Sequence, residues 1–179
     1  MALIKTNARS ATALDATILT GNLPAISGAS LTGLNNTPSF TAYLAANQDI
    51  SNDTITKITM NTELFDSGGT YDHSTNYRWT PATAGKYYIW ANVHYSGLNA
   101  ASLINTTVFI YKNGSEHVRF NHNPSNNYGD SFSLPINTIV DSDDNDYFEI
   151  YAYMNSNNSD RIQGGINYTR WGGYKIIGA

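Results

Sequence analysis

An acidic run near the C-terminal end is the densest group of side chains that could carry chemistry. It spans Asp141–Asp146 and contains four aspartates. Such oxygen ligands suit Ca²⁺, which takes about six to eight of them. The run lacks the central glycine and the distal bidentate glutamate of the EF-hand loop, however, and Asp, Ser and Asn also favour turns. The sequence therefore predicts a solvated turn with no metal, and a Ca²⁺ site is the alternative.

Groups for acid–base or nucleophilic catalysis are sparse. Glutamate occurs only at Glu63, Glu116 and Glu149, and no serine nucleophile elbow, zinc-binding His-Glu-x-x-His or phosphate-binding glycine loop is present. The four histidines are His73, His94, His117 and His122. A general base must meet a strict geometry, so each is expected to be an ordinary strand or loop residue. The absence of cysteine excludes disulfides and thiolate zinc sites. We predict that the protein is not an enzyme.

The charge pattern narrows the class of partner. Charged residues make up 13% of the chain, about half the usual share of roughly 25%, and Asn, Ser and Thr replace them. Such a surface suits neutral partners, including glycans. The ten Lys and Arg residues are scattered, which argues against nucleic acid. No apolar run approaches the ~18–20 residues of a membrane span, and the first residues lack the apolar core of a secretory signal.

The elements that must position these residues are strands. Apolar and polar residues alternate with period two over 85–97, 105–112 and 146–155, and Gly, Asn and Asp clusters separate the runs. The expected strands are 39–45, 55–60, 69–72, 75–80, 85–97, 105–112, 115–121, 130–138, 146–155 and 166–177. No helix is expected after residue 50. About ten short strands with regular turns predict an all-β sandwich or jelly roll.

Residues 1–38 differ from the rest of the chain. They contain no aromatic residue, whereas all 22 aromatic residues lie from Phe40 onward. A packed core draws much of its burial from aromatic side chains, so we expect an extended arm that becomes ordered against another surface. A flexible leader is the alternative. The anchor residues of this arm are expected to be Leu19, Leu23, Ile26, Leu31 and Leu34.

The segment 39–179, called the head below, resembles the C1q/TNF-like domain. It opens with Ser39-Phe40-Thr41-Ala42, similar to the family's F-x-A start. A Tyr-Asp pair at 71–72, an aromatic residue two before Pro81 and a Gly-x-Tyr at 85–87 follow in the family's order. Residues 169–176 resemble its closing strand. The resemblance implies a jelly roll of about ten strands.

The same resemblance implies a homotrimer. The residues expected at the trimer interface are Phe40, Tyr43, Tyr168, Trp171 and Tyr174. Gly172 and Gly173, inside the closing strand, suggest close backbone approach at a crowded place such as a threefold axis. The collagen-like stalk of many animal C1q proteins is missing, so the resemblance implies no animal-type role in immunity or signalling.

The arm carries a resemblance of its own. Residues 19–34, LTGNLPAISGASLTGL, are similar to runs in tail-fibre-like and appendage proteins of marine phages. With the unsignalled N-terminus, this leads us to expect a virion structural protein, either a tail or head fibre or a capsid decoration. Residues 1–38 would bind other virion proteins, and the head would meet host surface glycans. The alternatives are a secreted C1q-like glycan-binding protein unrelated to virions and a depolymerising fibre-tip enzyme. The few carboxylates disfavour the enzyme.

Overall fold

The computed structural model describes residues 36–97, 103–123, 131–156 and 160–177. These residues form strands and loops without a helix, which confirms the predicted all-β class. Within them, therefore, no helix is long and apolar enough to cross a membrane. The expected anchor residues of the arm (Leu19, Leu23, Ile26, Leu31 and Leu34) lie outside the described ranges, so the division into arm and head stays a prediction.

Two antiparallel sheets form the two layers of the head. The first sheet contains β1 (Ser39–Tyr43), β2 (Gln48–Ile50), β4 (Thr62–Ser67), β7 (Gly85–Gly97), β10 (Ser131–Ser142), β12 (Asp160–Ile162) and β13 (Arg170–Lys175). The second contains β3 (Thr56–Lys57), β5 (Tyr71–Asp72), β6 (Arg78–Trp79), β8 (Leu103–Lys112), β9 (Ser115–His122) and β11 (Phe148–Ser156).

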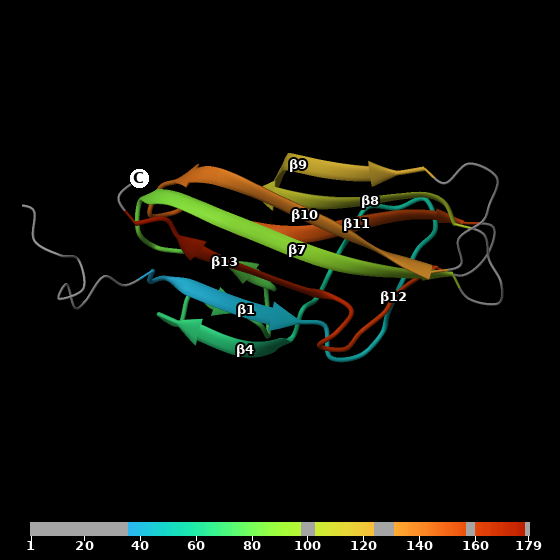
Figure 1. Cartoon of the computed structure of the whole chain (residues 1–179), viewed down its shortest axis with the longest axis horizontal. Helices are drawn as coiled ribbons and strands as arrows, with labels where there is room; N and C mark the ends of the chain where they lie inside the picture. Colours follow the sequence, from blue (N-terminus) through green and yellow to red (C-terminus); the bar gives the residue numbers. More distant parts are fainter. Residues whose placement is uncertain (1–35, 98–102, 124–130, 157–159, 178–179) are drawn as a thin grey trace, which may run out of the picture. The chain divides into compact units, whose positions relative to one another are not determined.

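The long strand β7 organises the first sheet. β10 pairs with β7 over twelve residues, from Ser131 opposite Ser96 to Ser142 opposite Gly85. On the other side of β7, β13 pairs with its first half and β12 with its last residues. β1 and then β4 continue the sheet beyond β13, and Figure 1 shows this succession with β8, β9 and β11 in the layer behind.

Period-two alternation places one set of β7 side chains in the core. Every second residue is buried, as the sequence predicted: Tyr87, Ile89, Ala91, Val93 and Tyr95. Phe148, Ile150, Ala152 and Met154 of β11 meet them from the second sheet. Because successive strand residues point to opposite faces, the other residues of β7 face outward.

Aromatic rings join the two sheets at one end of the core. Phe40 of β1 stacks on Tyr71 with ring centroids 4.8 Å apart, and lies 4.8 Å from Trp79 and 4.7 Å from Trp171. Tyr71 and Trp79 belong to the second sheet, while Phe40 and Trp171 belong to the first. Trp79 Nε1 donates to Thr70 Oγ1 and the Tyr71 hydroxyl donates to Met60 O, so the buried polar atoms of these rings are satisfied.

Gly172 and Gly173 each make room for an indole, one on each face of β13. A Cβ at Gly173 would lie 2.6 Å from Trp79 Cζ3 in the core. A Cβ at Gly172 would lie 2.6 Å from Phe40 O and 3.0 Å from Trp90 Cζ2. The crowding that the sequence indicated at these glycines is therefore found within a single subunit.

The structure differs from the predicted strands in specific places. β4 was not predicted, because a bulge where β1 meets β4 interrupts its alternation and leaves the adjacent Leu64 and Phe65 both exposed. β2 and β12, of three residues each, were also missed. β10 continues to Ser142, so the predicted turn of residues 141–146 begins two residues late. On β8, Thr107 and Phe109 are buried as well as Val108 and Ile110, so alternation does not separate its two faces.

Gly173→Ala is expected to destabilise the head by about 1–3 kcal/mol, the usual cost of overpacking a core. The added methyl group would press on the Trp79 ring. The free energy of unfolding from denaturant titration measures this. Trp79→Phe replaces the opposing indole with a smaller ring and supplies the matched test. The double variant should lose less unfolding free energy than the two single variants lose in total. Additive effects would contradict the proposed contact.

Candidate functional site

The outward face of the first sheet carries exposed aromatic residues. Strand pairing puts Phe65, Thr41, Gly172, Trp90 and Asn137 in one row across β4, β1, β13, β7 and β10. The neighbouring row contains Ser39, Tyr174, Tyr88 and Ile139, and the row on the other side contains Tyr43, Arg170, Asn92 and Pro135. The aromatic members of this surface, with Tyr168, are called the aromatic face: Tyr43, Phe65, Tyr88, Trp90, Tyr168 and Tyr174.

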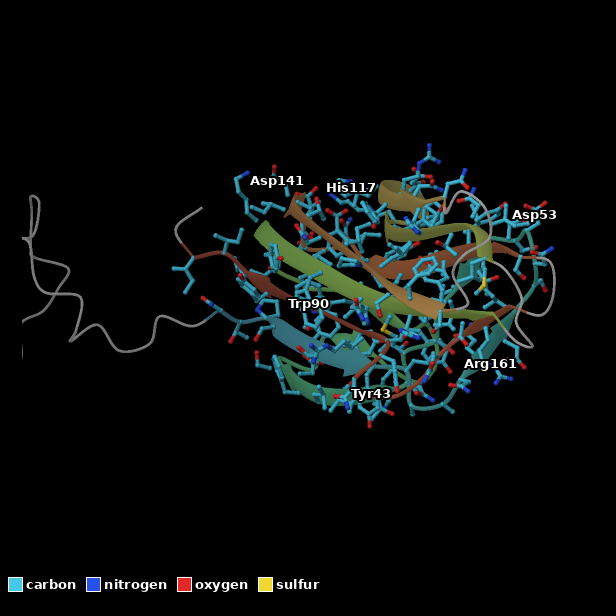
Figure 2. All side chains as sticks on the ribbon, turned by 45° about the vertical axis from the view of Figure 1, so that its right-hand side comes forward. Tyr43, Asp53, Trp90, His117, Asp141 and Arg161 are labelled. Carbon is cyan, nitrogen blue, oxygen red and sulfur yellow. The ribbon has the colours of Figure 1, made fainter. Side chains whose placement is uncertain are left out.

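Trp90 lies near the middle of this face. Figure 2 shows it partway along β7, between Asp141 at one end of the sheet and Arg161 at the other. Because Gly172 has no side chain, the indole can lie close above the backbone of β13. The Arg170 guanidinium lies 5.7 Å from its ring centroid, and the Tyr88 and Tyr174 rings are 5.5 Å apart. Phe65 remains 52% exposed. The face is therefore broad, apolar and largely open.

The residues expected at a trimer interface divide between two places. Tyr43, Tyr168 and Tyr174 are on the aromatic face, where Tyr168 also packs edge-on against His94 at 5.0 Å. Phe40 and Trp171 are each 1% exposed and lie in the core. Their side chains are thus unavailable to a neighbouring subunit, and they support the sheet from inside.

The spacing of these residues within their strands could have distinguished the buried ones from the outward ones from the sequence alone. Phe40 and Tyr43 are three positions apart in one strand, as are Trp171 and Tyr174, and residues an odd number apart point to opposite faces. Trp90 and Tyr88 were missed because they alternate with equally apolar residues in the same strand. Phe65 was missed with β4.

A second apolar surface lies along β9, at the side of the sandwich. Phe120 shares the inward face of the second sheet, opposite Val108, yet it is 47% exposed. Val118 and Phe132 are only partly buried beside the core, and His122 packs edge-on against Phe132 at 4.8 Å. Among the described strands, β9 pairs only with β8 and β10 only with β7. The residues Val118, Phe120, His122 and Phe132 are called the β9 edge.

Tyrosines on the outer face of the second sheet are arranged differently. Tyr111 and Tyr151 stack on each other with centroids 4.2 Å apart. Lys57 lies 5.7 Å from the Tyr151 ring, and Phe109 packs edge-on against Tyr111 at 5.9 Å. Lys57 also pairs with the buried Glu149 at 2.5 Å. These ring faces are occupied by neighbours, so they do not offer a flat platform on which a sugar could stack.

The acidic run binds protein groups. Asp146 is buried, and its carboxylate accepts hydrogen bonds from Asn113 Nδ2 at 2.6 Å and the Asp143 backbone N–H at 2.7 Å, with Lys112 Nζ at 2.7 Å. Asp141 pairs with Lys86. In the described ranges, no group of three or more Asp, Glu and His residues is placed to hold a metal ion. The donors around Asp146 thus engage both oxygens of its carboxylate.

The remaining titratable groups are mostly paired on the surface. His73 contacts Glu63 at 2.6 Å and Arg119 lies 3.5 Å from Glu116. His94 Nε2 is 2.6 Å from Ser131 Oγ, a nucleophile–base distance, but the pair lies on an open sheet face and the described residues enclose no ligand-sized cavity. Hydrolytic catalysis also requires oxyanion donors and an enclosed substrate.

Comparison with known proteins bears on the fold. No protein-family model and no curated protein matches the chain. Among solved structures, the globular domain of zebrafish complement 1qA aligns over 79% of this chain and 98% of that domain, with a TM-score of 0.56 and 13% identity. Murine APRIL aligns over 77% of this chain and 98% of its own, with a TM-score of 0.57 and 9% identity.

The head has the C1q/TNF-like jelly-roll fold. Eiger TNF from S. frugiperda is also similar, with a TM-score of 0.54 and 8% identity over 79% of this chain and 95% of that chain. These identities establish a shared fold and no more.

Removal of divalent cations is expected to leave the melting temperature unchanged, because protein donors already occupy Asp146. A ligand present at about 100-fold its Kd adds about 2.7 kcal/mol of stability, which calorimetry would detect. Scans with EDTA and with added Ca²⁺ make the comparison. A lower melting temperature in EDTA that Ca²⁺ restores would establish the alternative, a calcium site.

Asp146→Asn is expected to destabilise the head at neutral pH. Burial alone would raise the pKa of Asp146, but the bonds from Lys112, the Asp143 N–H and Asn113 outweigh it and lower the pKa to about 2. A depressed carboxyl pKa stabilises the fold above the unfolded value of 3.8 and loses this effect as pH falls towards 2. The difference in unfolding free energy between wild type and variant should therefore narrow on acidification. A difference independent of pH would contradict this assignment.

Proposed function

We propose that the head assembles into a homotrimer in which the β9 edge of one subunit packs against the aromatic face of the next. The support is that one chain carries two different exposed apolar surfaces, represented by Phe65 and Phe120. Large apolar patches on a soluble domain usually mark interaction sites. Contact between unlike patches is head-to-tail, and it closes into a ring when the rotation between subunits permits. The C1q-like resemblance implies a closed ring of three subunits.

We further propose that this trimer is a structural appendage or decoration of a phage virion, with the arm bound to other virion proteins and the head directed at the host surface. The similarity of residues 19–34 to runs in phage appendage proteins supports this placement. The weakly charged surface, rich in Asn, Ser and Thr, supports neutral partners such as host glycans. The described part of the chain has open apolar surfaces and no detected cavity, which supports a binding role in place of catalysis.

A secreted C1q-like glycan-binding protein is the second candidate. The observation that favours it is the alignment with almost the whole globular domain of zebrafish complement 1qA. The two candidates share the trimeric head and differ in what the arm binds. Adjacent genes for capsid, portal or tail proteins would decide for the virion.

The head is expected to sediment as a stable trimer at micromolar concentration. Phe65→Ser and Phe120→Ser should each weaken assembly about tenfold or more, because each removes an exposed phenyl ring from a contact surface and fully burying such a side chain contributes about 1.5–3 kcal/mol. Ile55→Ser is the matched control, since Ile55 is equally exposed and belongs to neither surface. Analytical ultracentrifugation measures all four proteins. A monomeric wild type would overturn the proposed assembly.

Mixing the two variants tests the head-to-tail arrangement. Phe65→Ser subunits keep an intact β9 edge, and Phe120→Ser subunits keep an intact aromatic face. Together they should form a heterodimer through one intact contact, although each alone sediments as a monomer. If Phe120→Ser alone forms dimers, like faces are pairing and the head-to-tail contact is refuted.

Deletion of residues 1–38 should leave a folded, soluble trimer that no longer attaches to virions. The truncated and full-length proteins are added to particles lacking this protein, and co-sedimentation with the particles is measured. Phe65→Ser in the full-length chain is the control for loss of assembly without loss of the arm. Binding of the truncated head at full occupancy would show that the arm is not the anchor.

A further inference from the structure

His94 lies on the outward side of β7, within the surface assigned above to subunit contact. Its Nδ1 is 2.9 Å from Ser133 Oγ and its Nε2 is 2.6 Å from Ser131 Oγ, so both ring nitrogens have hydroxyl partners on β10. The Tyr168 ring packs edge-on against the imidazole at 5.0 Å. The ring is thus held in place on a surface that we expect another subunit to cover.

The charges around His94 disfavour a second positive charge. Strand pairing places Arg170 of β13 opposite Asn92 and Arg161 of β12 opposite Ser96, the outward residues of β7 on either side of His94. Arg161 Nε is held by Asp49 Oδ1 at 2.8 Å, and Arg170 lies over Trp90.

Neither carboxylate placed on this face by strand pairing is available to a protonated imidazole. Asp49 belongs to Arg161, and Asp141 pairs with Lys86 at the opposite end of β10 and β7. From the described residues of β10, the ring meets the neutral hydroxyls of Ser131 and Ser133. Among the residues that the structure describes, strand pairing therefore gives an imidazolium here Arg170 and the Arg161–Asp49 pair as its charged neighbours, and no unpaired carboxylate.

We propose that His94 makes the subunit contact sensitive to acid, so that its protonation separates the trimer while each head stays folded. This inference rests on the trimer proposed above. Covering the face with the apolar β9 edge of a neighbour removes water from the ring, and an unpaired charge is costly to desolvate. A neutral His94 avoids that cost, since one hydroxyl can donate to the ring and the other can accept from it.

The direction of the pH dependence follows from the same geometry. Burial lowers the pKa of His94 in the single subunit, and covering the ring should lower this pKa further. The assembled state then binds fewer protons than the separated one, so assembly is complete at neutral pH and is lost as pH falls below the pKa of His94 in the separated subunit, which lies below the ordinary histidine value of about 6.5. One pKa unit corresponds to about a tenfold change in the equilibrium constant.

Ultracentrifugation of the full-length protein from pH 7.5 to 5.5, at constant ionic strength, tests the inference, with circular dichroism to confirm folding. The wild-type trimer should dissociate increasingly over this range, with the steepest loss at its acidic end. His94→Gln, and His94→Asn as a second neutral replacement, should remain trimeric throughout. His117→Gln, on β9 but outside both contact surfaces, should keep the wild-type response.

The outcomes separate the two proposals. A trimer at pH 7.5 that persists unchanged at pH 5.5, or an acid response retained by both His94 variants, would overturn the role of His94. Unfolding of the wild-type head at pH 5.5 would also overturn it. A monomer at pH 7.5 would instead contradict the proposed assembly itself.

Discussion

The packing of Phe40 against three rings is the contact on which the rest of the head depends. Phe40 and Trp171 come from the first sheet, and Tyr71 and Trp79 come from short strands of the second. β5 and β6 contain two residues each, too few to hold a sheet edge by backbone bonds alone. Each aromatic pair contributes about 0.5–1.5 kcal/mol beyond its buried area. The rings therefore secure the second sheet where its strands are shortest, and they place β1 and β13 so that the outward residues form one continuous surface.

Most ion pairs of the head lie away from the middle of the outward face of the first sheet, where the exposed aromatic rings are. Charged groups are concentrated in local pairs at strand ends and on the second sheet, as with Lys112 and Asp146 or Lys57 and Glu149. Burial alone would lower the pKa of Lys57, and the Glu149 carboxylate reverses this and raises it. The first sheet instead exposes aromatic rings and neutral amides, with Arg170 placed over Trp90. A chain with few charges can thus remain ordered and still present a broad surface without strong charge.

Much of the fold could be predicted from the sequence because β7 and β11 obey simple alternation, and the order of short motifs matched a jelly roll. β4 escaped prediction because a bulge disrupts its pattern, and β2 and β12 because three residues carry no period. Parity within β1 and β13 would have assigned Phe40 and Trp171 to the core. The contact of His94 with Ser131 and Ser133 had no sequence signal, since it depends on the pairing of β7 with a strand nearly forty residues away. The arm, Leu19 to Leu34 included, stays a prediction from composition.

The glycine pair in β13 has a consequence for folding fidelity. Most half-exposed strands have a polar side, and that side prevents a one-residue slip because slippage would bury it. This constraint is weak in the middle of β7, where Tyr88 and Trp90 on the outward side are as apolar as Tyr87 and Ile89 on the other; the polar outward residues Asn92, His94 and Ser96 come later in the strand. Gly172 and Gly173 also favour the native register. This pairing places Trp90 against a residue without a side chain and leaves space for the Trp79 ring on the other face of β13. Two residues without side chains thereby add a steric constraint on the register of the sheet, in the part of β7 where the polarity of the two sides differs least.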